Sequence, residues 1–279
     1  MLPTFLIIGA QKSGTSSLWA YLRQHPQVFV AAEKELNFFS APGDDLDIEQ
    51  YGRWFAAAPN TAAVGEASPG YTMYPLTDDV PAKIARTLPQ VRLIYLMRDP
   101  VERMRSAYTH RLSSGSEHRD IGRALLSDPS YMQVSMYATQ VERYLRCFPP
   151  SQLLLLTAEE LKRDRGATLR TVLSFIGVDP DWQPADLGAE YNTGAERQRV
   201  PRAWARWTGD VLIRTGAGRW APGVAPRALG HPLMSRRIRP AELTVPEGVR
   251  KQLNEALKPE IVRLAEWMPS SFDGWGLLD

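Results

Sequence analysis

The chain has 279 residues and a formal net charge of +2, and 44% of its residues are hydrophobic while 23% are charged. This composition is typical of a globular protein with a buried core and excludes a disordered or fibrous chain. The small net charge gives no reason to expect a nucleic-acid-binding protein. The one cysteine, Cys147, excludes an intrachain disulfide framework and a multi-cysteine zinc site.

The sequence itself predicts neither a membrane anchor nor a metal centre. Its first apolar run, Phe5–Ile8, is too short for the hydrophobic region of a signal peptide, and no basic region precedes it. No run approaches the roughly 20 apolar residues of a membrane span, and the four histidines show no metal-ligand spacing. We therefore expect a cytoplasmic protein with no transmembrane segment and no bound metal. The sequence does not indicate an oligomeric state.

Short apolar runs alternate with longer amphipathic segments. In chain order, the pattern predicts a strand at Thr4–Ile8, helices at Thr15–His25 and Ile48–Ala57, a strand at Ala63–Gly65, a helix at Pro81–Leu88, a strand at Arg92–Met97, helices at Pro100–Leu112 and Gln133–Phe148, a strand at Leu153–Leu156, and helices at Ala158–Lys162, Ala167–Ile176 and Glu247–Trp267. This alternation predicts an α/β fold with a central, mainly parallel sheet flanked by helices. Because no polar linker separates the units, we expect a single domain over residues 1–279, with its core at about residues 3–180.

The segment between residues 195 and 240 differs in composition from the rest of the chain. It contains ten arginines, three tryptophans (Trp204, Trp207 and Trp220) and many Gly and Pro residues. We expect a long loop or lid at about residues 190–245 with short helical pieces. It would close over a nucleotide, bind an anionic or sugar ligand, or form a solvated surface with its tryptophans buried.

The loop after the first predicted strand has the composition of a phosphate site. Residues 9–17 read GAQKSGTSS and lead into a helix. A glycine-bearing turn at a helix N-terminus offers backbone N–H groups to an anion, and Lys12 adds a positive charge. The glycine spacing matches a Walker A loop, but Thr15 stands where that motif requires lysine. We expect a phosphate site without a metal-bound triphosphate. The alternative is an ordinary surface turn with an incidental lysine.

A second candidate phosphate site follows the strand at Arg92–Met97. Asp99 is suited to cap the next helix, with Pro100 in its first turn. Arg98 would lie at the carboxyl end of the strand, where open α/β sheets bind ligands, and its guanidinium suits a phosphate. Ser106 is a candidate to share that anion. The alternative is that Arg98 pairs with an acidic side chain at the sheet edge.

The two sites occur in an ordered set of motifs, PTFLIIGAQKSGTSSLWAYLRQHPQV, KELNFFS, GEASPGY, RLIYLMRDPVERMRSAY and MYATQVERYLRCFPPSQLLLL. This set resembles the sulfotransferases that use 3′-phosphoadenosine 5′-phosphosulfate (PAPS), and especially their heparan sulfate branch and its bacterial relatives. The resemblance covers about residues 3–180. It implies a P-loop-like strand–loop–helix and transfer of a sulfuryl group from PAPS to a hydroxyl or amine. It also implies release of adenosine 3′,5′-bisphosphate (PAP). We expect the reaction to need no metal, because lysine, arginine and helix N-termini supply the positive charge.

The resemblance assigns donor-binding roles residue by residue. The loop residues expected to hold the 5′ side of PAPS are Lys12, Ser13, Gly14, Thr15 and Ser16. Arg98 and Ser106 match the 3′-phosphate site of the family. The nearest counterpart of the family's late basic loop contains Arg197 and Arg199. Lys12 would also neutralise the charge that builds on the leaving oxygen.

The resemblance implies that Glu35 is the catalytic base, because it matches the glutamate with that role in the heparan sulfate enzymes. A carboxylate within about 3 Å of the acceptor suits proton removal. His110 is the rival base, and His118 is a weaker one. The alternative for Glu35 is a solvated pair with Lys34.

The acceptor side departs from the family pattern. Asn37 and Ser40 stand where the heparan enzymes often have His and Asp, and Ala67 replaces the lysine that follows their third-motif glutamate. These departures put a glycosaminoglycan acceptor in doubt, so carbohydrate, lipid and small-molecule acceptors all remain open. The predicted acceptor-binding residues are Asn37, Glu66 and Ser68. An ordinary turn at residues 68–70 is the alternative.

Two other functions compete with sulfuryl transfer. One is a P-loop-type kinase for nucleotides or small molecules, which the missing Walker lysine opposes. The other is a non-catalytic protein that binds an anionic polymer through the Arg- and Trp-rich segment, with steep salt dependence.

Overall fold

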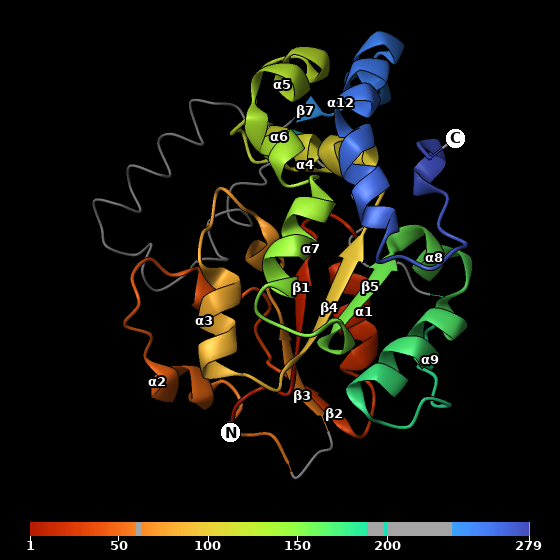
Figure 1. Cartoon of the computed structure of the whole chain (residues 1–279). Coiled ribbons are helices and arrows are strands. Elements are labelled where there is room, and N and C mark those ends of the chain that lie inside the picture. Colours follow the sequence, from red (N-terminus) through yellow and green to blue (C-terminus); the bar gives the residue numbers. More distant parts are fainter. Residues whose placement is uncertain (60–62, 189–197, 200–235, 279) are drawn as a thin grey trace. The chain divides into compact units, whose positions relative to one another are not determined.

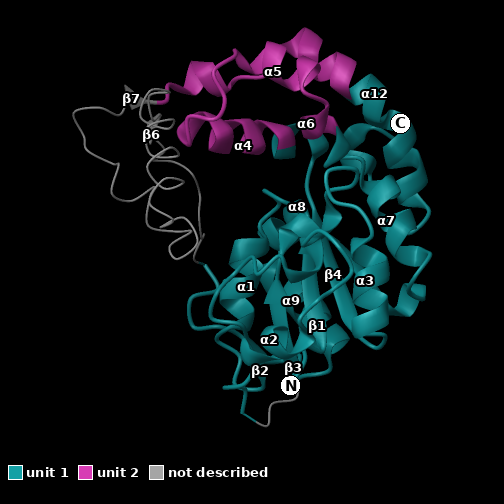
Figure 2. Cartoon of the chain, turned by 90° about the vertical axis from the view of Figure 1, so that its left-hand side faces the viewer, with its two compact units in different colours: residues 1–103, 133–192, 254–279 teal, residues 104–132, 193–253 magenta. Residues whose placement is uncertain are grey.

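The computed structural model describes residues 1–59, 63–188, 198–199 and 236–278. The chain divides into two compact units (Figure 2). The first unit consists of residues 1–103, 133–192 and 254–279, and the second of residues 104–132 and 193–253.

A five-stranded parallel sheet forms the centre of the first unit (Figure 1). Its strands are β1 (Phe5–Gly9), β2 (Val28–Val30), β3 (Ala63–Ala67), β4 (Arg92–Met97) and β5 (Leu153–Thr157). Their order is β2-β3-β1-β4-β5, and every neighbouring pair is parallel. The predicted α/β fold with a mainly parallel sheet is therefore confirmed.

The apolar run of β1 is buried on both faces of the sheet, as expected for a central parallel strand. Leu6 and Ile8 pack into one hydrophobic cluster, while Phe5 and Ile7 pack into the other. The neighbouring strand makes room for this packing at Gly65, where an added Cβ would lie 2.4 Å from the Phe5 ring. Gly65 is thus required by the close approach of a side chain.

Helices cover both faces of the sheet in the first unit. The face with Phe5 and Ile7 packs against α1 (Thr15–Leu22), α8 (Ala158–Arg163) and α9 (Arg165–Ile176). The opposite face packs against α2 (Ile48–Arg53), α3 (Val80–Thr87), α7 (Tyr137–Leu145) and the C-terminal part of α12 (Glu247–Ala265). The strand–loop–helix predicted at the start of the chain is present as β1, residues 10–14 and α1.

The second unit contains most of α4 (Pro100–Ser113), α5 (Ile121–Ser127), most of α6 (Pro129–Gln133) and the first turns of α12. The short strands β6 (Gln198–Arg199) and β7 (Arg236–Arg237) pair antiparallel. Most of the Arg- and Trp-rich segment, residues 200–235, lies outside the described residues. So does the prediction that it forms a lid.

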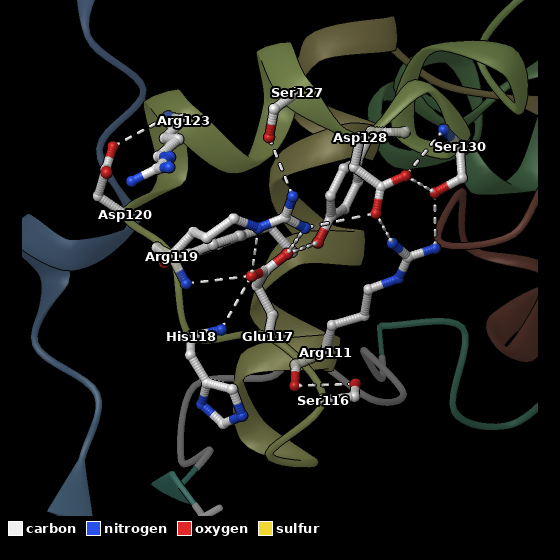
Figure 3. Close-up of polar contacts among 12 residues, drawn as sticks. Arg111, Ser116, Glu117, His118, Arg119, Asp120, Arg123, Ser127, Asp128 and Ser130 are labelled. Atoms are coloured by element: carbon white, nitrogen blue, oxygen red, sulfur yellow. Dashed lines mark hydrogen bonds and ion pairs between the residues drawn. The ribbon is translucent and has the colours of Figure 1, made fainter.

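A buried carboxylate, Glu117, anchors the loop between α4 and α5 in the second unit (Figure 3). Arg119 donates to both of its oxygens, from Nε at 2.9 Å and from Nη2 at 2.6 Å. The backbone N–H groups of His118 and Arg119 and the hydroxyl of Tyr131 donate to the same carboxylate. Arg119 also contacts Asp128 at 3.4 Å, which links this loop to the segment before α6.

The predicted helix at Gln133–Phe148 is wrong at its start. α6 ends at Gln133 and α7 begins only at Tyr137. The hydroxyl of Ser135, between them, accepts from Arg103 Nε at 2.6 Å and donates to the Pro100 carbonyl at 3.3 Å. A buried serine committed to these partners favours a break over a continuous helix.

Within the described ranges, none of the helices combines the length and apolar character needed to cross a bilayer. The same residues contain no group of three or more His, Cys, Asp or Glu side chains arranged around a common metal position.

Candidate active site

The loops that follow four neighbouring strands carry the predicted site residues of the first unit. Glu35 and Asn37 follow β2, Ser68 follows β3, the residue 10–14 loop follows β1, and Arg98 follows β4. Because all four strands are parallel, their carboxyl ends lie along one edge of the sheet, where open α/β proteins bind ligands. The structure therefore brings these residues to the same edge.

The loop after β1 presents the N-terminus of α1. Gly14 adopts φ 96° and starts the helix, and Lys12 adopts φ 72°, so both lie in the left-handed region. Among the residues that the structure describes, no side chain caps α1. The first N–H groups of a helix have no acceptor within it, so Thr15 and Ser16 direct donors outward from the first turn. The arrangement suits an anion.

Ser13 provides an independent indication that this loop holds a ligand. Its side chain is 1% exposed, and no group in the described structure is in hydrogen-bonding geometry with its Oγ. Its neighbour Tyr137 donates its hydroxyl hydrogen to the Arg98 carbonyl at 2.7 Å. A buried hydroxyl without a partner costs about 1–3 kcal/mol, so it is retained where a further group satisfies it. A phosphate or sulfuryl oxygen fits this requirement.

Arg98 lies directly after β4 with its side chain about one-third exposed. Its guanidinium lies 3.9 Å from the Glu102 carboxylate. The acidic partner predicted as the alternative is therefore present, but at a distance too long for a hydrogen bond. Asp99 accepts from the Glu102 backbone N–H at 2.9 Å, which confirms the predicted cap of α4. The Arg98 backbone is held by Tyr137, whose pKa burial raises to about 12.

Glu35 lies in an unusual backbone conformation beside β3. Its φ is 66°, and its N–H donates to the Ala67 carbonyl at 2.9 Å. Its side chain is 53% exposed and pairs with Lys34 at 2.6 Å. Asn37 donates from its side chain to the Glu35 carbonyl at 2.9 Å. The carboxylate is thus accessible, and the alternative pairing with Lys34 is present as well, so the role of base stays a prediction.

Glu66 and Ser68 are buried beneath this loop. Ser68 Oγ donates to Glu66 at 2.6 Å, and the hydroxyls of Tyr51 and Tyr71 donate to the same carboxylate. Sequence reasoning missed both tyrosines. Tyr71 belongs to the quoted GEASPGY motif, but Tyr51 stands in a helix that carries no recognisable motif. The predicted contact of Glu66 and Ser68 with an acceptor stays a prediction.

The remaining predicted residues lie elsewhere. Ser106, His110 and the weaker candidate His118 belong to the second unit. Arg197 lies outside the described residues, and Arg199 is described only as part of the β6 backbone. Their predicted roles are therefore not addressed by the geometry of the first unit.

A parallel sheet flanked by helices, with a glycine-bearing strand–loop–helix at its carboxyl edge, defines an α/β protein of the kind that can hold a phosphate there. A family model described as a sulfotransferase domain matches residues 2–192. The chain belongs to this sulfotransferase family, and the resemblance inferred from its motifs is confirmed.

Curated relatives include heparan sulfate enzymes. The human bifunctional heparan sulfate N-deacetylase/N-sulfotransferase 3 is 29% identical over 206 residues, which cover 65% of this chain and 23% of the relative. The mouse heparan sulfate glucosamine 3-O-sulfotransferase 3B1 is 33% identical over 190 residues, which cover 63% of this chain and 46% of the relative. The match therefore spans less than half the length of either relative.

Solved structures share the fold. A sulfotransferase from Alicyclobacillus acidocaldarius is 26% identical with a TM-score of 0.71, and the match covers 99% of each chain. A mouse sulfotransferase complexed with PAP is 13% identical with a TM-score of 0.50, covering 99% of this chain and 87% of that one. The second likeness shows the fold alone.

Proposed function

We propose that this protein transfers the sulfuryl group of PAPS to a hydroxyl or amine of an acceptor and releases PAP. The observation that carries the proposal is the N-terminus of α1 with the buried Ser13 Oγ, for both of which the described residues supply no side-chain partner, in a chain that belongs to the sulfotransferase family. The family match also opposes the kinase alternative.

The loop after β1 would bind the 5′ end of the donor. Its proposed contacts are Lys12, Ser13, Gly14, Thr15 and Ser16. The backbone donors and the helix dipole favour a negatively charged group there without requiring a metal. Arg98 would bind the 3′-phosphate, and Ser106, Arg197 and Arg199 are the other proposed contacts of the donor. The two sets of residues would supply positive charge at both ends of the donor.

In the proposed reaction, Glu35 takes the proton of the acceptor hydroxyl or amine as the acceptor atom attacks sulfur. A new bond forms between that atom and sulfur, and the bond from sulfur to the 5′-phosphate oxygen breaks. The electron pair of the broken bond remains on PAP, where Lys12 neutralises the growing charge. His110 is the alternative base. In-line positioning of the reactants supplies much of the catalysis, by analogy with phosphoryl transfer.

The acceptor is proposed at the level of class: a carbohydrate, a lipid or a small molecule bearing a hydroxyl or amine. Both curated relatives reported above are named for heparan sulfate, which favours a carbohydrate among these. Asn37, Glu66 and Ser68 are the proposed acceptor-side residues. The predicted cytoplasmic location also remains a proposal, which cell fractionation would test.

Calorimetric titration tests the donor site directly. We expect PAP to bind in the presence of EDTA and ATP with Mg²⁺ to bind weakly or not at all. Arg98→Ala should weaken PAP binding at least tenfold, because it removes a charge-assisted contact worth about 1.5–3 kcal/mol. The matched control is Arg86→Ala, which removes an exposed arginine paired with Asp44. Magnesium-dependent ATP binding with no PAP binding would overturn the proposal.

Transfer from labelled PAPS then tests the chemistry. Glucosamine, 2-naphthol and octanol serve as probes of the three acceptor classes. Glu35→Gln should abolish most transfer while PAP affinity is unchanged. His110→Gln should do so instead if His110 is the base. Steeply salt-dependent binding to heparin that persists in Lys12→Ala and Glu35→Ala, without PAP binding, would favour the polymer-binding alternative.

A further inference from the structure

Glu66 lies within β3 on the same face as Val64, and its carboxylate is 1% exposed. Three hydroxyl groups donate to it: Ser68 at 2.6 Å, Tyr71 at 2.7 Å and Tyr51 at 2.8 Å. Burial raises the pKa of Glu66, and the three hydroxyl hydrogen bonds act in the opposite direction. A buried carboxylate that accepts three short hydrogen bonds fixes the positions of the three donors, because losing any one of these bonds costs free energy in the core.

Each of the three hydroxyl-bearing residues also contacts the short segment at residues 37–39. Ser68 Oγ accepts from the Asn37 N–H at 3.0 Å, and the Tyr71 hydroxyl accepts from the Phe39 N–H at 3.5 Å. The Tyr51 ring stacks on Phe38, with centroids 4.2 Å apart and planes 11° from parallel. Two of the hydroxyls thus relay hydrogen bonds from the loop backbone to Glu66, and the third residue supports the loop by stacking.

The segment held in this way directly follows Glu35 and has a demanding conformation. Glu35 adopts φ 66° and Asn37 adopts φ 50°, which for residues other than glycine cost roughly 1 kcal/mol or more each. Asn37 approaches Gly70 so closely that a Cβ added there would lie 2.6 Å from Asn37 Oδ1. Such a backbone persists where surrounding contacts fix it, and these contacts converge on Glu66.

We propose that Glu66 is a positioning residue that acts through Ser68, Tyr71 and Tyr51 to hold the 35–39 loop, and with it the Glu35 carboxylate, in place for proton removal. This role rests on the proposed function, in which Glu35 is the base. It replaces the acceptor contact proposed above for Glu66 by an action through the loop, because the Glu66 side chain is buried. It also gives Tyr51 and Tyr71 a role in the reaction.

Hydrogen exchange tests the positioning without any acceptor. In Ser68→Ala and Tyr71→Phe, peptides covering residues 34–40 should exchange faster than in the wild type, while peptides covering α1 should be unchanged. The matched control is Tyr131→Phe, which removes a hydroxyl that donates to a buried carboxylate in the second unit. Unchanged exchange in residues 34–40 would overturn the proposal.

Kinetics test whether positioning serves Glu35. With the acceptor probe that the wild type uses best, Ser68→Ala and Tyr71→Phe should lower kcat about 10- to 100-fold, the scale expected for a misplaced reacting group. KM for PAPS and PAP affinity should be unchanged. In the Glu35→Gln background the same substitutions should cause no further loss, because residues that act through one group are not additive. Additive losses, or losses confined to PAP binding, would overturn the role.

The two proposals fail in different ways. A wild type that neither binds PAP nor transfers the sulfuryl group overturns the proposed function and the positioning role with it. A wild type that transfers the group, with Ser68→Ala and Tyr71→Phe equally active, overturns the positioning role alone. Glu66→Gln serves as a further variant, because it keeps the side-chain volume while replacing one accepting oxygen. It should reproduce the faster exchange of residues 34–40.

Discussion

Replacing Glu117 with glutamine should destabilise the second unit near neutral pH, and the loss should shrink on acidification. Burial by itself would raise the pKa of Glu117, but the hydrogen bonds from the Arg119 side chain and from the backbone N–H groups of Arg119 and His118 lower it from its usual 4.5 to about 2. The ionised carboxylate is therefore favoured by folding. Its contribution is complete above the unfolded-state pKa and is lost as the pH falls towards 2.

The size of the effect follows from this pKa. Each tenfold change in proton affinity corresponds to about 1.4 kcal/mol, so the lowered pKa is worth on the order of 3 kcal/mol. Arg119 is 36% exposed, so solvent screening reduces the value, and we expect about 2 kcal/mol near pH 7. Between about pH 7 and pH 3.5, the difference between wild type and Glu117→Gln should fall by about 1 kcal/mol.

Urea denaturation of both proteins at these pH values measures the difference in the free energy of unfolding. Hydrogen exchange of peptides covering residues 114–132 locates the loss. Glu49→Gln is the matched control, because it removes one member of an exposed i,i+4 pair with Arg53 and should change stability by less than about 0.5 kcal/mol. A Glu117→Gln difference that is the same at both pH values would refute the assignment to ionisation.

Two further predictions concern the sheet and its first loop. Ser13→Ala should leave the melting temperature unchanged or slightly higher, because it removes a buried hydroxyl that has no hydrogen-bond partner among the described residues, yet calorimetry should show about tenfold weaker PAP binding. A clear loss of stability with PAP affinity unchanged would contradict the ligand role of Ser13. Gly65→Ala should destabilise by about 1–3 kcal/mol in urea denaturation, because its Cβ would overlap the Phe5 ring. Gly248→Ala, on α12 where no atom of the described residues lies within 4 Å of the added Cβ, is the control and should be neutral or slightly stabilising.

The central strands of the sheet can be predicted from sequence because both of their faces are buried, which requires an almost continuous run of apolar residues. β1 and β4 are apolar throughout their buried length, and β4 has its predicted bounds, Arg92–Met97. β2 was not predicted, because its three residues Val28–Val30 are too few to show a periodic pattern. Its place at the edge depends on pairing with β3, which single-sequence periodicity does not contain.

The candidate site divides in the same way. The loop with Lys12 and Gly14 and the helix cap at Asp99 are recognisable from neighbouring residues in the sequence. Predicting them therefore needs no knowledge of the fold. The partners of Glu66 were not found, because Tyr51 reaches it from a helix that is separate in sequence. The motif placed Glu66 near a strand end but did not show that it shares the buried face of Val64. The burial of Glu66 depends on contacts with segments that are distant in the sequence.

The position of β1 at the centre of the sheet has a consequence for how the chain acquires its structure. Phe5 pairs with Gly65 on one side and with Arg92 on the other. Both hydrogen-bonding edges of the first strand therefore stay unpaired until these later segments of the chain have been synthesised. Pairings between such distant segments form slowly, because loop closure precedes any gain from contact. Until β4 is available, FLIIG is an uncharged apolar strand with two open edges, which is the kind of segment that associates with other chains. The strand at the centre of the finished sheet is therefore open to misassembly during synthesis.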